Sequence, residues 1–137
     1  MRKLFLIFFF TLFLSSNLFA KPIFINCIED RIISNKRSFI FEIDDQKKDI
    51  ILVAGISVKE ATKNIKEFSK NSIDLDYDGV ISYKLDSDNN PVPTGENYIS
   101  FYINRITGKM LYVMSQRDSK KLEAMESYTC SKAEAKF

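Results

Sequence analysis

Hydrophobic and polar residues alternate with a period of two along much of this chain. Such alternation is typical of strands that bury one face and expose the other. Segments with this pattern, or with aromatic and aliphatic runs of strand length, are 38–44, 73–77, 98–103, 110–114 and 128–130. The continuous apolar run 50–54 predicts a strand that is buried on both faces. The chain is therefore expected to be mainly β.

One segment, residues 58–70, is compatible with a helix or with a strand. Ser57-Val58-Lys59-Glu60 has the form of a helix capping box. The apolar residues that would then share one helical face are Val58, Ala61, Ile65 and Phe68. Alternatively, residues 65–69 form a short strand that pairs with the segment from Ser72 onward through a turn at Lys70-Asn71. β-branched and Asn residues weaken the helix propensity here, so both alternatives stay open.

Two long polar stretches, 86–97 and 116–126, are expected to be loops. Pro91 and Pro93 argue against regular structure in the first of them. Between these stretches, residues 98–110 predict a hairpin whose loop is Ile106-Thr107-Gly108. In that register Ile103 opposes Leu111, and the apolar side chains of the two strands share one face.

The segment from Asp74 to Ile81 resembles the first half of an EF-hand calcium loop. Asp74, Asp76 and Asp78 stand at positions 1, 3 and 5, and Gly79 stands at position 6. Position 12, which should supply a bidentate glutamate, is Leu85. The three aspartates are therefore only a weak candidate metal site.

The same segment also fits a hairpin with a three-residue loop, Tyr77-Asp78-Gly79, in which the glycine takes the left-handed conformation. This register pairs Leu75 with Ile81, and it also pairs Ile73 with Tyr83. Asp74 and Asp76 then fall on the opposite face from these apolar residues. We favour the hairpin because the downstream residues have the pattern of a strand.

The N-terminal residues 1–20 have the layout of a secretory signal peptide. Arg2 and Lys3 precede an apolar run of 11 residues, and Ala20 offers a small residue for cleavage. A membrane-spanning helix needs roughly 20 apolar residues. The sequence thus predicts a signal peptide, 1–20, followed by a single domain, 21–137, in the periplasm or outside the cell.

Export would carry the two cysteines, Cys27 and Cys130, into a compartment where disulfides persist. They lie on the first and last expected strands of the domain. A disulfide needs their Cα atoms within about 7 Å, so these two strands should adjoin. The expected fold is an antiparallel meander that closes into a small barrel or sandwich, with one disulfide and at most one short helix, at about 58–70.

Charge argues against nucleic acid as a partner. The chain has 20 basic and 18 acidic residues, and Arg2 and Lys3 belong to the predicted signal. The remaining domain is therefore formally neutral, whereas nucleic-acid binding depends on a concentrated excess of cations. Contact with a membrane is expected only through the signal segment before cleavage.

Several common chemistries lack their usual residues. The chain has no His, which removes the most frequent general base and neutral metal ligand. It has four glycines and no phosphate-binding glycine-rich loop or nucleophile elbow. If both cysteines are paired, no thiol nucleophile remains. No catalytic residue and no cofactor are therefore predicted, although a pair among the acids could still act together.

The motif Asn104-Arg105-Ile106-Thr107-Gly108 and the segment Tyr128-Thr129-Cys130 resemble those of small exported bacterial proteins of unknown function. These proteins share an Asn/Asp-Arg-x-Thr-Gly hairpin and a late cysteine segment, and the likeness covers about the last forty residues. It implies a β-rich fold and no particular activity. Asn and Thr commonly fold their side chains onto turn backbone, so we favour a structural role for Asn104 and Arg105.

The early and late cysteines are also similar to those of periplasmic lysozyme inhibitors of the membrane-bound C-type-inhibitor kind, which are small exported β-barrels. Their Ser-Gly inhibitory loop has no counterpart here, so the likeness implies architecture only. We expect an exported binding or interaction module for a small ligand or an envelope protein. The alternatives are an inhibitor of a cell-wall hydrolase and, third, a hydrolase that uses paired carboxylates.

Overall fold

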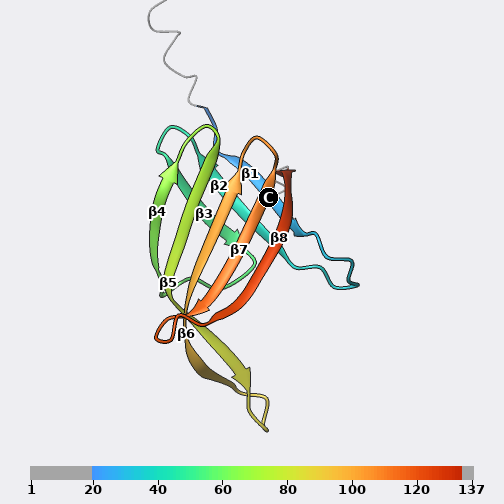
Figure 1. Ribbon diagram of the computed structural model, residues 1–137, viewed down its shortest axis with the longest axis vertical. Helices are drawn as coiled ribbons and strands as arrows, with labels where there is room; N and C mark the ends of the chain where they lie inside the picture. Colours follow the sequence, from blue (N-terminus) through green and yellow to red (C-terminus); the bar gives the residue numbers. More distant parts are fainter. Residues whose placement is uncertain (1–19, 134–137) are drawn as a thin grey trace, which may run out of the picture.

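The computed structural model describes residues 20–133, which form one eight-stranded antiparallel sheet with no helix (Figure 1). The predicted signal peptide lies outside the described residues except for Ala20. The strands are β1 (Ile23–Glu29), β2 (Ser38–Asp44), β3 (Asp49–Ala54), β4 (Thr62–Phe68), β5 (Ser72–Leu85), β6 (Pro91–Asn104), β7 (Lys109–Gln116) and β8 (Leu122–Ala133).

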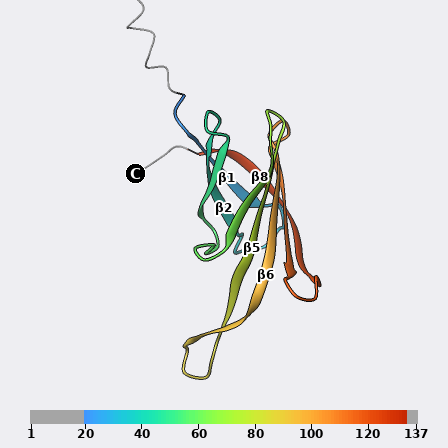
Figure 2. The same cartoon turned by 90° about the vertical axis from the view of Figure 1, so that its left-hand side faces the viewer.

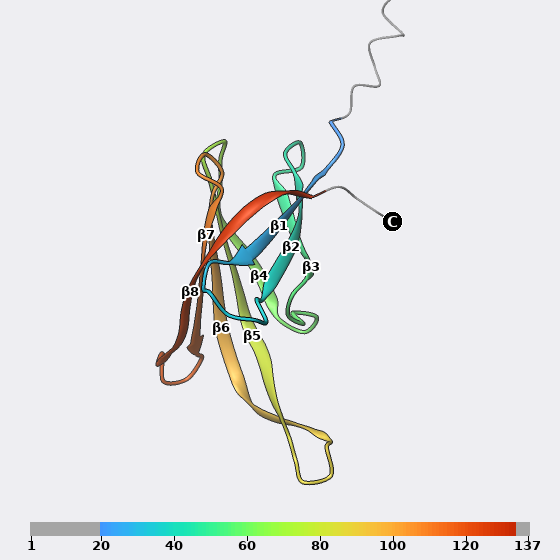
Figure 3. The same ribbon diagram turned by 90° about the vertical axis from the view of Figure 1, so that its right-hand side faces the viewer.

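The first and last strands lie side by side, as the cysteines predicted. The spatial order is β3-β2-β1-β8-β7-β6-β5-β4, and β1 pairs with β8 so that Cys27 lies directly opposite Cys130. The two residues form a disulfide. The sheet curls into a nearly closed barrel (Figures 2 and 3). The mainly β, disulfide-linked fold predicted from the sequence is confirmed.

Side chains bridge the seam that separates the two edge strands, β3 and β4. Lys63 Nζ on β4 donates hydrogen bonds to Asp49 Oδ1 (2.6 Å) and to the Ile50 carbonyl oxygen (3.2 Å) on β3. Beside the seam, Arg105 makes a bidentate ion pair with Asp45 at 2.7 and 2.8 Å and donates to the Ser69 carbonyl (2.9 Å). These contacts tie three turns together at one end of the barrel.

Aromatic side chains fill the barrel interior. The Phe101 ring lies 5.1–5.5 Å, centroid to centroid, from the rings of Phe39, Phe41 and Tyr112. Phe101 is completely inaccessible to solvent. Such offset and edge-to-face pairs add to the stability gained from apolar burial. The interior is thus a packed core.

The ambiguous segment 58–70 forms a strand, and the helix alternative is wrong. Residues Thr62–Phe68 make up β4 and pair with β5. The tight turn after β4 is held by Ser69, whose N–H donates to the Ser72 carbonyl at 2.9 Å. Pairing with β5 satisfies the backbone of β4 and buries part of Ile65, so tertiary contacts override the local capping signal.

The run 50–54 is not buried on both faces. β3 buries Ile50 and Leu52, whereas Ile51 and Val53 are 48% and 44% exposed. An edge strand has a neighbour on one side only, and none of the described elements covers its outer face. Ile51 and Val53 have a high β propensity, so their presence on the outer face does not indicate a second buried face.

The hairpin predicted at residues 73–83 is wrong, because β5 continues through it to Leu85. Gly79, with φ of +85°, forms a bulge between Asp78 and Val80 and makes no turn. Leu75 therefore faces Phe101 on β6. A bulge glycine and a hairpin glycine need the same left-handed conformation, so this sequence could not distinguish them.

The two polar stretches predicted to be loops, 86–97 and 116–126, are largely strand. β6 begins at Pro91, and only Asp86–Asn90 turn the chain between β5 and β6. Both prolines lie where their missing N–H breaks no ladder bond, which is why the strand tolerates them. Likewise, β8 begins at Leu122, and the turn before it is short.

The hairpin at residues 98–110 exists, but its register differs by one residue from the expected one. Ile103 opposes Met110 rather than Leu111, and Leu111 lies on the outer face opposite Tyr102. The Asn104 carboxamide oxygen accepts hydrogen bonds from the N–H groups of Ile106 (3.0 Å) and Thr107 (2.9 Å). This contact lengthens the loop to four residues, and a slip of one residue exchanges the two faces of a strand.

Candidate functional site

The hairpin of β5 and β6 extends beyond the barrel. β4 pairs with β5 only as far as Asp78, and β7 pairs with β6 only as far as Asn97. Residues 79–96, which we call the arm, therefore project from the end of the barrel (Figures 1 and 3). No neighbouring strand of the described chain pairs with either edge of this projection, and its residues 83–96 are exposed.

The tip of the arm is an ordered turn. The Asp86 carboxylate accepts hydrogen bonds from the N–H groups of Asp88 (2.9 Å) and Asn90 (2.8 Å). The Asp86 N–H in turn donates to the Asn90 carbonyl at 3.0 Å. These bonds hold the pKa of Asp86 below its ordinary value. A side-chain oxygen that caps turn backbone in this way reduces the freedom of the tip.

The root of the arm is braced by Arg117, from the turn between β7 and β8. Its guanidinium pairs with Asp78 on β5 (Nε to Oδ1, 3.0 Å) and with Glu96 on β6. Its backbone N–H also donates to the Glu96 carbonyl at 3.0 Å. Arg117 thus pairs with both strands where they leave the barrel, and its hydrogen bonds to Glu96 add direction to the electrostatic restraint.

One side of the arm is apolar and exposed. Tyr83 and Leu85 alternate on β5, and they are 58% and 65% exposed. They stand opposite Pro93 and Pro91 on β6, which are also exposed. Single exposed apolar residues are ordinary, but a group of them on a projecting element is typical of an interaction site.

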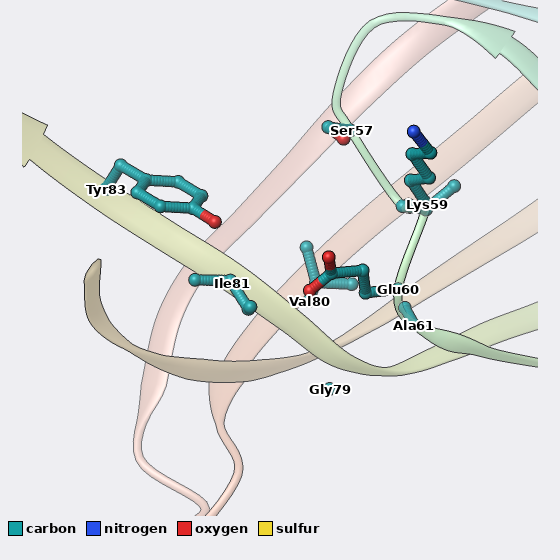
Figure 4. Close-up of a pocket in the computed structure, with 9 residues that line it drawn as sticks. Ser57, Lys59, Glu60, Ala61, Gly79, Val80, Ile81 and Tyr83 are labelled. Carbon is teal, nitrogen blue, oxygen red and sulfur yellow. The ribbon is translucent and has the colours of Figure 1, made fainter. Parts of the chain in front are cut away.

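A small hollow lies at the root of this apolar side, between β5 and the segment that leads into β4 (Figure 4). Its volume is about 110 Å³. Its lining residues are Ser57, Val58, Lys59, Glu60, Ala61, Gly79, Val80, Ile81 and Tyr83. Tyr83 and Ile81 approach it from β5, and Lys59 and Glu60 approach it from the opposite segment.

The candidate metal ligands Asp74, Asp76 and Asp78 lie in a row along the outer face of β5 and are engaged differently. Asp76 is buried and binds Lys66 Nζ, the Tyr98 hydroxyl and Ser100 Oγ (2.7 Å for Ser100). Asp78 pairs with Arg117. Within residues 20–133, no group of three acidic, His or Cys side chains is arranged to hold a metal ion.

Asp74 and Asp76 have pKa values shifted in opposite directions. Burial opposes ionisation of Asp76, but hydrogen bonds from Lys66, Tyr98 and Ser100 outweigh it, so its pKa is lowered. The pKa of Asp74 is raised by burial and by the neighbouring Asp76 charge. Oppositely shifted acids are a feature of acid–base catalysts. Here both Asp76 oxygens already accept hydrogen bonds, which leaves that carboxylate poorly placed to act as a base.

A second buried carboxylate lies at the end of β1. The Glu29 side chain is inaccessible to solvent and pairs with Arg31 and Arg37, and both arginines also pair with Glu126 on β8. The Tyr128 hydroxyl donates to Glu126 Oε2 at 3.0 Å. No local sequence pattern indicates this cluster, because Glu126 lies about 90 residues from the two arginines in the chain. Its saturated contacts indicate a structural role, fixing the β1–β2 loop on β8.

Sequence reasoning missed the arm, although signals for it were present. Residues 80–85 alternate in the pattern of a strand, and Asp86-Ser-Asp-Asn-Asn90-Pro has the composition of a turn. The prolines that follow, Pro91 and Pro93, instead favour a loop. Asn104 and Arg105, by contrast, have the structural roles favoured from sequence, capping a turn and bridging the seam.

No protein-family model matches the chain, and neither a curated protein nor a solved structure shows significant similarity to it. Among residues 20–133 there is no helix of sufficient length and hydrophobicity to span a membrane. The disulfide is consistent with an oxidising, extracytoplasmic location. A functional conclusion therefore depends on the arm and its chemistry.

Proposed function

We propose that this protein is an exported binding module, periplasmic or secreted, that contacts an envelope protein through its arm. The observation that supports this proposal is the combination of restraint and exposure. The arm is capped at its tip by Asp86 and braced at its root by Arg117, yet Tyr83 and Leu85 remain in solvent. Restraint of this kind lowers the entropy cost of association.

A protein partner fits the arm better than a small ligand does. The aromatic side chains of the barrel pack against one another and fill its interior. The hollow at the arm's root, about 110 Å³, is smaller than the roughly 300–1,000 Å³ of typical ligand pockets. Larger open hollows, of about 550 and 830 Å³, lie at other places, and each is lined by a single aromatic residue.

Site-specific photo-crosslinking in the intact envelope tests the proposal. A photoreactive residue at Leu85 should give a discrete protein adduct. The matched control is the same residue at Ile51, which is also apolar and half exposed, but lies on β3. Adding excess unlabelled wild type should abolish the adduct, whereas Tyr83→Ser/Leu85→Ser protein should not compete. Equal adducts from both positions would contradict an arm-specific site.

Inhibition of a cell-wall hydrolase is the second candidate, favoured by the projecting, pre-ordered tip. Protein inhibitors commonly present such a preformed loop to the enzyme. Adding the protein to a muramidase that digests purified peptidoglycan should slow the loss of turbidity, and the Tyr83→Ser/Leu85→Ser variant should not. If both proteins leave digestion unchanged, this second candidate is discarded for that enzyme class.

A further inference from the structure

The end of the barrel opposite the arm carries an excess of basic residues on its turns. Three turns lie there, residues 45–48, 69–71 and 105–108, beside residues 20–22, which lead into β1 (Figures 1 and 3). We call these four segments the basic end. They contain one acid, Asp45, and five basic residues, which gives a formal charge of +4. The basic residues are Lys21, Lys47, Lys48, Lys70 and Arg105.

Acids close to the basic end do not cancel this charge. Asp44 and Asp49, at the adjoining ends of β2 and β3, pair with lysines at 3.3 and 2.6 Å. Glu67 on β4 accepts hydrogen bonds from serine hydroxyls. Counting also the two strand residues nearest each segment and the last two of β8 adds these three acids together with Lys109 and Lys132. The formal charge is then still +3.

Two lysines of the basic end are available to a ligand. Lys48 and Lys70 are exposed, and neither side chain makes a hydrogen bond or ion pair within the described part of the chain. They line an open hollow of about 550 Å³ between the turns, together with Asp45, Phe68, Ser69 and Arg105. Arg105 holds Asp45 in a bidentate ion pair at 2.7 and 2.8 Å. The two free ammonium groups suit a phosphate, to which lysine binds as a point charge.

An apolar side chain projects from the same end. Ile106 lies in the turn between β6 and β7 and is 73% exposed. Its position is fixed, because the Asn104 carboxamide oxygen accepts hydrogen bonds from the N–H groups of Ile106 and Thr107. Basic residues around an exposed apolar side chain match the surface of an anionic bilayer, which offers phosphates above an apolar layer.

The predicted signal peptide joins the domain at this end. Lys21 follows the predicted signal directly in the sequence, and residues 20–22 enter β1 beside the three turns (Figure 3). Before cleavage the signal holds this end of the domain at the membrane. An acidic protein would match the charge of the turns, but it would account neither for Ile106 nor for this placement. Both observations favour a lipid surface as the partner.

We propose that the basic end binds the surface of an anionic phospholipid bilayer, and that this contact persists after the signal is removed. Lys48 and Lys70 contact lipid phosphates at the hollow, and Ile106 enters the headgroup layer. The contact is weak and reversible, because one apolar side chain and a few cations do not form a permanent anchor. It is independent of the proposed function and holds the arm away from the membrane, where an envelope protein can reach it.

Flotation of the protein purified after export tests the role of charge. The probes are vesicles of phosphatidylcholine with and without phosphatidylglycerol. The protein should float with the anionic vesicles only, and salt should release it. Lys48→Glu/Lys70→Glu should lower the affinity at least about tenfold. The matched control, Lys120→Glu/Lys121→Glu, lies in the turn between β7 and β8 and should lower it less than about twofold. Lys120 and Lys48 both have a left-handed backbone, with φ of 55° and 51°.

Tryptophan fluorescence identifies the part of the molecule that enters the bilayer. The chain contains no Trp, so one introduced residue reports on one position. The emission of Ile106→Trp should shift to shorter wavelength with anionic vesicles, and brominated lipid should quench it. Leu85→Trp in the arm and Ile32→Trp in the β1–β2 loop should show neither effect, although the native side chains are 65% and 101% exposed. Ile32 is the stricter control, because Arg31 beside it is also basic but is already paired.

Each outcome decides for or against the membrane contact. Equal flotation with neutral and anionic vesicles, equal losses in the two lysine double variants, or bilayer entry at position 32 or 85 instead of 106 would overturn it. Absence of flotation would also overturn it, and saturable binding of polyglutamate would then assign the basic end to an acidic protein. The fluorescence measurement stands alone if a lysine variant does not fold. The crosslink at Leu85 is unaffected in every case, so the proposed function is tested separately.

Discussion

The barrel and the arm use the same strands, β5 and β6, in opposite ways. Inside the barrel, Leu75 and Phe101 are completely buried and face each other in the core. Beyond the bulge at Gly79, Val80 keeps the core-facing side of β5, whereas Tyr83 and Leu85 lie on the other side and extend into solvent. Burial of apolar surface stabilises the fold, so the first pair contributes to stability and the second does not. The exposed pair therefore has no role in the core and supports the proposal that the arm is a binding surface.

The restraints of the two regions also differ. The barrel is held by a disulfide and by a shared aromatic core, whereas the arm is held by a capped turn and by ion pairs of Arg117. Surface ion pairs contribute little to global stability. Substitutions in the barrel should therefore change the free energy of unfolding, and substitutions in the arm should change local order and binding.

The largest effect is expected from the disulfide. It links residues 103 positions apart, and closing a loop of about 100 residues stabilises by up to roughly 4.7 kcal/mol in the chain-entropy model. Cys27→Ser and Cys130→Ser should each lower the melting temperature substantially, and the double variant should be no worse than either. Thermal unfolding measures this. Free thiols in the native, oxidised protein would contradict the premise.

The second prediction compares the loss of stability when a buried core ring, Phe101, or an exposed arm ring, Tyr83, is removed. Phe101→Ala should cost about 3–5 kcal/mol, because it removes a buried ring that contacts several others. Tyr83→Ala should change stability by no more than about 0.5 kcal/mol, because the ring is largely exposed. Urea unfolding of both variants gives the comparison. A large loss for Tyr83→Ala would show that the arm is part of the folding core.

The barrel was predictable from the sequence because its signals are local or unambiguous. Period-two patterns place strands 38–44 and 98–103, and the two cysteines require the first and last strands to meet. The arm was not, because the segment Asp74–Gly79 has the residues of a tight turn and its bulge has the same glycine requirement. The pairing of β5 with β6 on both sides of Gly79, at Asp78–Tyr98 and at Val80–Asn97, shows that the strand continues.

The polar contacts were the least predictable part. The sequence places Asp76 on the polar face of a hairpin, but Lys66 from β4 and Tyr98 from β6 cover it. Lys66, Asp76 and Tyr98 come together only when β4, β5 and β6 pair side by side, whereas the sequence favours a hairpin within residues 73–83. Turn capping by Asn104 was predictable because it is a local property of Asn, whereas the ion pair of Arg105 with Asp45 joins residues 60 positions apart.

The third prediction compares neighbouring aspartates on the outer face of the barrel. Asp76→Asn should cost about 1–3 kcal/mol, because it weakens three hydrogen bonds to a buried carboxylate. Asp74→Asn should instead stabilise by up to about 0.5 kcal/mol at pH 7, because it removes a partly buried charge beside Asp76. Urea unfolding at pH 7 measures both. Equal effects of the two substitutions would refute the assigned environments.

The opposite pKa shifts of Asp76 and Asp74 predict how the stability of the fold changes with pH. Because the pKa of Asp76 is lowered in the fold, its stabilisation is complete above its ordinary pKa of 3.8 and is lost as the pH falls through the folded value. Because the pKa of Asp74 is raised, its contribution is present below 3.8 and is lost as the pH rises through its folded value. Wild type should therefore lose stability in acid more steeply than Asp76→Asn, and unfolding between pH 2 and 6 tests this.

The smallest global effect and the clearest local one are expected from Arg117→Gln. Losing its exposed ion pairs should cost at most about 1 kcal/mol of global stability. The arm would then be anchored only by its own ladder, so amides of the arm should exchange several-fold faster while those of Leu75 and Phe101 keep their protection. The matched control is Lys121→Gln in the same turn, whose pair with Glu123 (3.8 Å) does not involve the arm. If both variants leave exchange in the arm unchanged, the root brace has no mechanical role, and the order of the arm comes from the Asp86 turn alone.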